Sequence, residues 1–348
     1  MNQLKYLACL LPVLGMLILA ACGRAAQETG PQVGDFFNFA PDTTSVIQSL
    51  EEEMANVNHT MFTSHVNADG SRIQQRINAL NQDITIVLEN RDGAVRQIFA
   101  WADFPLWEDV TGIEAAMELV ILQEPLVVGN TWDNGVGGVS EITGMDMSLT
   151  TPAGAFTGVI QVTTVFEQTG DYSITYFAPG HGQIQDNHTT TFQGNEFSNV
   201  NQLIEVVSGE GLGATVFVLY PDDELLGLDY QAIDVEVLTN QNFAQLFTQL
   251  IQAHMPSLSD VTVQSLSIDR DNGLITVDFS RELLEVAAGS GAEQLLLYSL
   301  ANMFGAFFWL PAFVPTVEGA IYESGHFSFA DGESIPVGSG LQQGVAHE

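Results

Sequence analysis

Basic residues are scarce in this sequence. Eight lysines and arginines stand against 43 aspartates and glutamates, which gives a formal net charge of −35. A chain of this charge repels phosphate backbones, so the sequence excludes nucleic acid as a partner. After Lys5 every basic residue is an arginine. Arginine keeps its charge where lysine begins to lose its proton, so an acidic surface without lysine suits alkaline or saline surroundings.

Cysteine is also rare, and the chain has only Cys9 and Cys22. Removal of an N-terminal signal would leave one of them, so neither a disulfide nor a cysteine zinc site is expected. The seven histidines form no H-E-x-x-H motif, and no G-x-S-x-G, Walker or Rossmann pattern is present. We therefore expect no catalytic residue, no metal and no cofactor, and we predict that the protein is not an enzyme.

The first 21 residues are typical of an export signal. Lys5 precedes an apolar run over 7–20 that is too short to span a membrane comfortably. The run ends in Leu19, Ala20, Ala21 and Cys22, which resembles a bacterial lipobox, where signal peptidase cuts before a cysteine that carries diacylglycerol. We predict a signal peptide over 1–21 and a lipid anchor on Cys22. The protein would then lie on the extracytoplasmic face of the bacterial cell membrane.

The next segments predict a tether and a β-rich domain. Residues 22–34 are rich in small and polar residues, which favours a flexible tether. Over 35–200 apolar and polar residues alternate, as at Ile84, Ile86 and Leu88, and turn signals such as Asp92-Gly93 separate the runs. These patterns predict an antiparallel β-rich domain. Residues 46–57 fit either a short helix or a polar strand.

From about residue 205 the pattern becomes mixed. Apolar residues at helical spacing over 243–251 predict a helix that is capped at Thr239 or Asn240 and ends before Pro256. Asp271-Asn272-Gly273 predicts a hairpin turn. Ser290 and Glu293 form a capping-box pattern that opens a second helix. The order is β-α-β-β-α-β over 205–337, so the whole chain is predicted to be α+β, with a loose tail over 338–348.

One segment raises a second interpretation. Residues 295–314 carry no charge and are about as long as a membrane span. Ser299, Asn302 and Gly305 interrupt the run, Pro311 would break a helix, and no basic residue follows. We therefore expect a core helix followed by a turn.

Two regions resemble known families. Residues 214–335 look like the GerMN domain, a sporulation and spore germination domain of Gram-positive bacteria. The likeness rests on the strand at 216–220, the Val-Asp-Phe-Ser stretch at 277–280 and the helix start at 291–295. Residues 35–195 resemble the β-rich region ahead of this domain in some bacterial lipoproteins, through the motifs at 124–132, 151–156 and 176–182.

The resemblance implies a cell-surface lipoprotein without a known catalytic centre. We therefore expect a non-catalytic binding or scaffolding role in the cell envelope, with a protein partner and a link to sporulation or germination. Two alternatives stay open. A hydrolase acting on envelope or wall material would need two facing carboxylates. A small-ligand-binding lipoprotein would need a deep apolar pocket with a few convergent polar groups.

Overall fold

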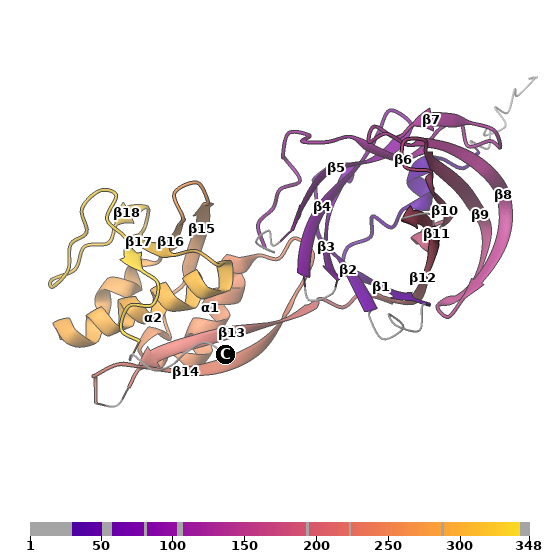
Figure 1. Ribbon diagram of the computed structural model, residues 1–348. Coiled ribbons are helices and arrows are strands. Elements are labelled where there is room, and N and C mark those ends of the chain that lie inside the picture. Colours follow the sequence, from indigo (N-terminus) through magenta and orange to yellow (C-terminus); the bar gives the residue numbers. More distant parts are fainter. Residues whose placement is uncertain are drawn as a thin grey trace, which may run out of the picture. The chain divides into compact units, whose positions relative to one another are not determined.

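A computed structural model of the chain describes residues 30–50, 58–79, 82–102, 107–192, 195–222, 224–286 and 289–341 (Figure 1). The predicted signal peptide, the lipobox with Cys22, most of the tether and most of the predicted loose tail lie outside the described residues. The described residues from Gln32 onward form one compact unit.

A single twelve-stranded antiparallel sheet dominates the structure (Figure 1). Its strands arise from alternation. In β1, for example, every second side chain is buried from Thr43 to Ser49. The segment over 46–57, which fitted either a helix or a strand, therefore begins as a strand. The strands are β1 Thr43–Ser49, β2 Asn58–Val66, β3 Arg72–Ala79, β4 Gln82–Arg91, β5 Ala94–Ala102, β6 Leu119–Gln123, β7 Thr131–Asp133, β8 Val139–Thr151, β9 Gly154–Phe166, β10 Asp171–Ala178, β11 Gly182–Phe192 and β12 Asn195–Ser208.

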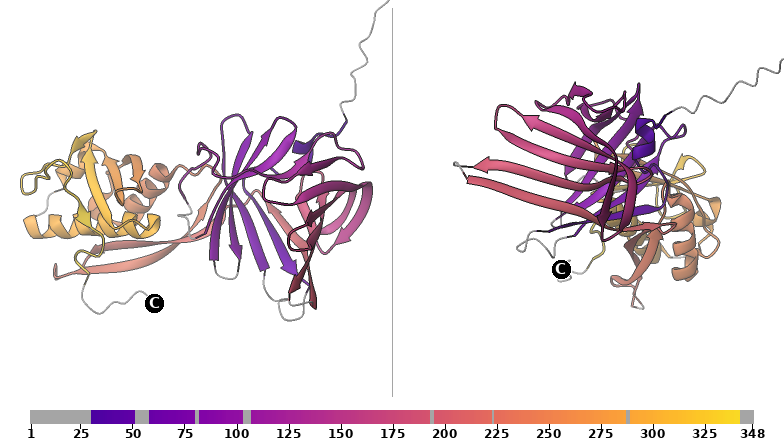
Figure 2. Two further views of the ribbon diagram at one scale, coloured as in Figure 1. Left: turned by 45° about the horizontal axis from the view of Figure 1, so that its top comes forward. Right: turned by 90° about the vertical axis from the view of Figure 1, so that its right-hand side faces the viewer.

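The sheet consists of two meanders joined in the middle. Strands β1 to β6 follow one another in one direction, β12 to β7 in the other, and β1 pairs with β12. The two edge strands, β6 and β7, then meet. The Val120 amide donates to the Asn134 carbonyl oxygen at 2.9 Å, and the Trp132 indole donates to the Val120 carbonyl oxygen at 3.1 Å. The sheet is therefore bent round on itself and nearly closed, and we call it the curled sheet (Figure 1; Figure 2).

A short 3-10 helix, η1 (Val33–Phe36), packs against the inner face of the curled sheet. Val33 and Phe36 are buried in one cluster with Trp132 and Ile160. The Gly180 amide donates to the carbonyl oxygen of Asp35 at 2.6 Å, which ties η1 to the turn between β10 and β11. The last residues of the predicted tether therefore already belong to the folded body.

The C-terminal part places two helices against a second set of strands. Strand β16 pairs antiparallel with β15 and parallel with β17, and α2 makes the crossover to β17. Phenylalanines from both helices and these strands fill the core, among them Phe247, Phe279, Phe304 and Phe313. The elements are β13 Leu212–Pro221, β14 Leu228–Val237, α1 Phe243–His254, η2 Pro256–Leu258, β15 Val263–Asp269, β16 Leu274–Phe279, η3 Arg281–Glu285, α2 Ser290–Phe308, β17 Ala312–Val317, β18 Ala320–Ile321 and β19 Ile335–Pro336.

The predicted α+β class is wrong, because the protein is mostly β. Strands make up 53% of the described residues and helices 15%, with two α-helices among them. One reason lies in β14. This strand pairs with β13 along its whole length, and its Ile233, Val235 and Val237 alternate with Asp234 and Glu236, a strand pattern that the sequence interpretation left unassigned. The expected single strand is thus a long two-stranded hairpin.

Two predicted helix caps are also wrong. Helix α1 is capped by Asn242, whose side chain accepts from the Gln245 amide, and not by Thr239 or Asn240. Helix α2 has Gly289 at its N-cap without a side-chain bond. The carboxylate expected to complete the capping box, Glu293, instead accepts a 2.8 Å hydrogen bond from the buried Tyr322 hydroxyl. Because the buried Tyr322 hydroxyl needs an acceptor, the Glu293 carboxylate binds this hydroxyl and does not cap the helix N-terminus.

Residues 295–314 are confirmed as a core helix followed by a turn. Leu296, Leu300 and Phe304 of α2 are buried in the C-terminal core, and the helix ends at Phe308, before Pro311. None of the helices in the described ranges is long and apolar enough to cross a membrane.

Two residues after β14 bind the backbone of β2 and of the residue that precedes β1 in the curled sheet. Thr239 accepts from the Asp42 amide at 2.6 Å and donates to the Thr63 carbonyl oxygen at 2.6 Å. Asn240 has a left-handed backbone with φ of 55°, and its side-chain amide pairs with the main chain of Val66 at 2.9 and 3.0 Å. We call Thr239 and Asn240 the joint.

Candidate functional site

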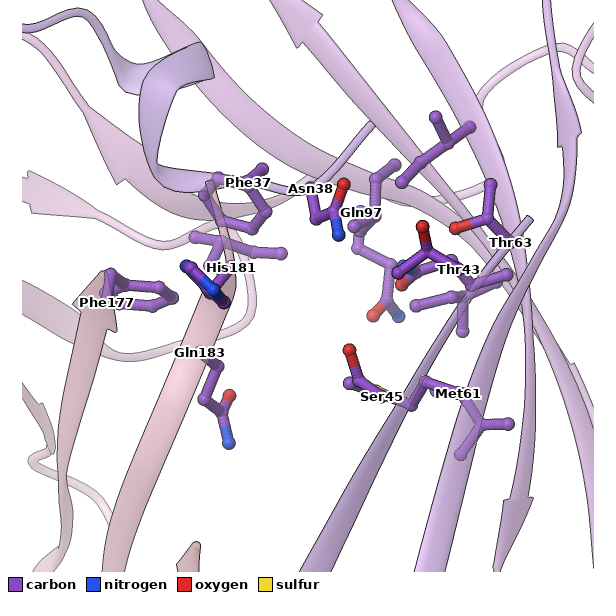
Figure 3. A pocket seen from close by; sticks show the side chains of 17 residues that line it. Phe37, Asn38, Thr43, Ser45, Met61, Thr63, Gln97, Phe177, His181 and Gln183 are labelled. Atoms are coloured by element: carbon purple, nitrogen blue, oxygen red, sulfur yellow. The ribbon is translucent and has the colours of Figure 1, made fainter. Parts of the chain in front are cut away.

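The curled sheet encloses a cavity of about 210 Å³, which we call the lumen cavity (Figure 3). Among the residues that the structure describes, no aspartate, glutamate, lysine or arginine lines it, although the chain carries 43 acidic residues. The apolar lining consists of Phe37, Met61, Ile73, Ile77, Ile86, Leu88, Ile121 and Phe177, and the polar lining of Asn38, Thr43, Ser45, Thr63, Gln75, Gln97, His181 and Gln183, with Gly182 completing the wall.

Strand alternation and register bring these side chains together. Ser45 of β1 lies opposite Met61 of β2, and Thr63 of β2 lies opposite Gln75 of β3. Directly paired residues share one face of a sheet, so polar and apolar side chains come to alternate across the inner wall. On the far wall, Phe177 of β10 pairs with Gln183 of β11. The inner face is thus mixed in character, unlike a dry core.

Several polar groups of this wall have no partner within the described ranges of the chain. Among the described residues, the side chains of Ser45, Gln75 and Gln183 form no hydrogen bond, and the Thr63 hydroxyl forms none either. Buried amides and hydroxyls normally find a partner inside the protein or in water. These groups therefore remain able to bind water or a ligand in the cavity.

The segment after η1 and the turn between β10 and β11 border the cavity. Phe37 and Phe177 lie with ring centroids 5.6 Å apart. His181 stands in the turn with its Nδ1 2.8 Å from the Pro179 carbonyl oxygen and its ring edge-on to Phe156. The glycines on either side of it have φ of 72° and 74°, in the left-handed region that glycine adopts readily in turns. The sequence did not indicate that His181 also lines a cavity (Figure 3).

A charged group lies further along the same inner face. Asp186 is paired in register with Asn201, which in turn lies opposite the buried Ser49 of β1. Burial raises the pKa of the Asp186 carboxyl above its ordinary value, and the 2.8 Å bond from the Thr175 hydroxyl and the nearby His188 only partly offset this. No second carboxyl among the described residues is a cause of this shift in pKa. The described carboxyls therefore do not give Asp186 the facing partner that the hydrolase alternative requires.

Metal-binding groups do not gather in the part of the chain that the structure describes: no three His, Cys, Asp or Glu side chains lie close enough to hold an ion. The site residues predicted from the sequence, Leu19, Ala20, Ala21 and Cys22, lie outside the described residues, so the lipid-anchor prediction stays a prediction.

Comparisons with known proteins give little further assignment. No family model matches the sequence, the GerMN family included, and no curated protein matches it either. One solved structure, provisionally named an exported protein with a YMCC-like fold from Bacteroides fragilis, is similar over 50% of this chain and 99% of its own, with 10% identity and a TM-score of 0.33. A provisionally named lipoprotein from Parabacteroides distasonis is similar over 49% and 98%, with 11% identity and a TM-score of 0.28.

At TM-scores this low, neither likeness assigns a fold or a role to the chain. The resemblance to the GerMN domain gains no support from the comparisons and stays a prediction.

Proposed function

We propose that this protein is a lipid-anchored, extracytoplasmic and non-catalytic binding protein whose curled sheet holds a small uncharged ligand. The observation that carries the proposal is the lumen cavity, whose described lining is uncharged and combines apolar side chains with amide and hydroxyl groups that have no partner in the described part of the protein. Apolar pockets with a few convergent polar groups are the usual form of a small-molecule site.

The size and charge of the cavity define the ligand class. In another protein, an engineered apolar cavity of about 150 Å³ holds benzene, so the lumen cavity of about 210 Å³ fits one ring with a small polar substituent. An ionised ligand would lose its hydration without gaining a counter-ion from the lining. A neutral molecule that both donates and accepts hydrogen bonds would meet Gln75, Gln183 and Ser45.

The anchored location rests on the lipobox at Cys22. The finer expectations, a protein partner in the envelope and a link to sporulation or germination, rest on the GerMN resemblance alone. The binding proposal does not depend on them, because it follows from the composition of the lumen cavity.

The test is a titration of the purified protein with benzamide, followed by amide chemical shifts in NMR spectra. Benzoate serves as the charged probe of nearly the same size. Thr63→Phe places a large side chain in the lumen cavity, and Thr157→Phe makes the same change at an exposed position on β9. We expect saturable shifts at lumen residues with benzamide, weaker or no shifts with benzoate, and loss of the benzamide response in the Thr63 variant only.

Equal responses to benzamide in both variants would place the probe outside the lumen and overturn the proposal. So would the absence of any saturable response in the wild-type protein. Stronger binding of benzoate than of benzamide would contradict the uncharged ligand class.

A further inference from the structure

The loop between β6 and β7 presents an exposed apolar turn. Val127 and Val128 are 53% and 60% exposed, and no charged residue occurs from Pro125 to Trp132. The turn is nevertheless well fixed. The Val127 amide donates to the Pro125 carbonyl oxygen at 2.9 Å, and the Asn130 amide donates to the Val127 carbonyl oxygen at 3.1 Å. The valines are therefore held outward by the backbone.

Packing on both sides keeps this turn in place. Leu126 packs against the inner cluster that contains Trp132, and the Gly129 amide donates to the Ile142 carbonyl oxygen at 2.9 Å. An aliphatic pair that is more than half exposed in a rigid turn is unfavourable in water, because its apolar surface stays hydrated. Such a surface is the kind that contacts another apolar phase.

The same turn lies beside the point where the N-terminal segment joins the folded body. The Val33 amide donates to the carboxylate of Glu124 at 3.3 Å, and Glu124 directly precedes the turn. Eleven positions separate Cys22 from Val33, and a chain of that length spans at most about 40 Å. An anchor at Cys22 would therefore keep this corner of the protein within reach of the lipid surface.

We infer that, in the anchored protein, Val127 and Val128 enter the lipid interface and form a second, non-covalent membrane contact. The occupant is a lipid surface, because the anchor confines the turn near one and because the turn is uncharged. A net charge of −35 repels anionic headgroups, so contact requires a local apolar element and not general adsorption. This inference rests on the anchored location in the proposed function and is independent of the ligand.

The chain provides a clean labelling experiment. Once Cys22 is acylated, an introduced cysteine is the only free thiol in the mature protein. The full-length protein is expressed with Val127→Cys, its diacylated Cys22 is verified by mass spectrometry, and the thiol is labelled with bimane in phosphatidylethanolamine–phosphatidylglycerol vesicles. The control is Leu226→Cys, which replaces another exposed aliphatic residue in a turn, 73% exposed, between β13 and β14.

We expect a blue shift at position 127 and quenching by spin-labelled lipids, with neither effect at position 226. Acylated protein without quenching at position 127 would overturn the membrane contact and leave the anchor and the ligand proposal intact. Equal quenching at both positions would indicate general adsorption and would also overturn it. Absence of acylation would instead overturn the anchored location, and the membrane contact with it, before any label is read.

Discussion

The Thr239 hydroxyl donates a 2.6 Å hydrogen bond to the main-chain carbonyl oxygen of Thr63, a residue whose own side chain lines the lumen cavity. The same hydroxyl accepts from the Asp42 amide, next to Thr43 in the cavity wall. One side chain from the segment after β14 thus fixes the backbone of two strands that shape the site.

Replacing Thr239 with valine should destabilise the protein. The change leaves the Asp42 amide and the Thr63 carbonyl without their partner, and an unsatisfied buried group costs about 1–3 kcal/mol. Urea denaturation followed by circular dichroism measures the loss in unfolding free energy. Thr215→Val removes a hydroxyl from an exposed position on β13, where the bond to Asp234 faces solvent, and should change stability by no more than about 0.5 kcal/mol. Equal effects in both variants would contradict the special role of the joint.

Trp107 should contribute far more to stability than Trp101. Trp107 is 8% exposed, stacks on Phe307 with centroids 5.8 Å apart and lies 6.1 Å from Phe243, whereas Trp101 is 61% exposed. Trp107→Ala removes a ring from the C-terminal core, and such truncations cost about 3–5 kcal/mol. Trp101→Ala should cost about 0.5 kcal/mol. Thermal unfolding of the two variants side by side checks the order, and a smaller loss for the Trp107 variant would refute it.

Asp186 should lower stability at neutral pH. Burial raises the pKa of its carboxyl in the folded protein, so the protonated form is favoured by folding. The stability that comes from the protonated carboxyl is fully present below the pKa of Asp186 in the unfolded chain. It is lost as the pH rises through the pKa of Asp186 in the folded protein. Asp186→Asn keeps an acceptor for Thr175 and removes the charge. The variant should therefore unfold at a higher temperature than wild type at pH 7, and the difference should vanish on acidification.

Asp171 supplies the matched control for that experiment. Hydrogen bonds from Thr190 and its neighbours lower the pKa of this exposed carboxyl. The stability that comes from the ionised carboxylate is present above the pKa of Asp171 in the unfolded chain. It is lost as the pH falls through the pKa of Asp171 in the folded protein. Asp171→Asn should accordingly destabilise the protein at pH 7. The Asp186 account fails if both variants shift the unfolding temperature in the same direction.

Cys22→Ala should release the protein from membranes. The thiol is the predicted attachment point of the diacylglycerol, and acyl chains contribute about 0.8 kcal/mol per buried CH₂ group. Fractionation of cells and metabolic labelling with a palmitate analogue measure the change. Cys9→Ala alters a residue within the predicted signal peptide and should leave anchoring intact. A wild-type protein that takes up no label would refute the anchor.

The sequence predicted individual elements better than the fold class. The helix over 243–254, the hairpin at 271–273 and the alternating strands near Ile86 follow from spacing and turn chemistry, which act locally. The closure of the twelve-stranded sheet does not follow from such local patterns, because it depends on β1 pairing with β12 across a long stretch of chain and on β6 and β7 meeting at the ends of the two meanders. No local pattern encodes those pairings.

The candidate site was missed for a related reason. Thr43 and Ser45 alternate with Thr44, and Gln75 follows Gln74, so polarity does not distinguish the inner from the outer face. Strands that line a partly polar lumen show only a weak strand pattern in the sequence, because the period-two alternation of hydrophobicity disappears when both faces of the strand are mixed. The clue was the run of short hydroxyl and amide residues in segments that otherwise favour strands.

The seam between β6 and β7 has a consequence for how the interior is reached. The other neighbouring strands of the curled sheet pair in register, with bulges in several ladders, whereas the described residues of β6 and β7 form no such ladder and are joined by the Val120 amide, the Trp132 indole and the Asn130 side-chain amide. Thermal breathing begins where the fewest bonds must break. The wall would then part sideways along this line, giving a guest molecule a lateral gate.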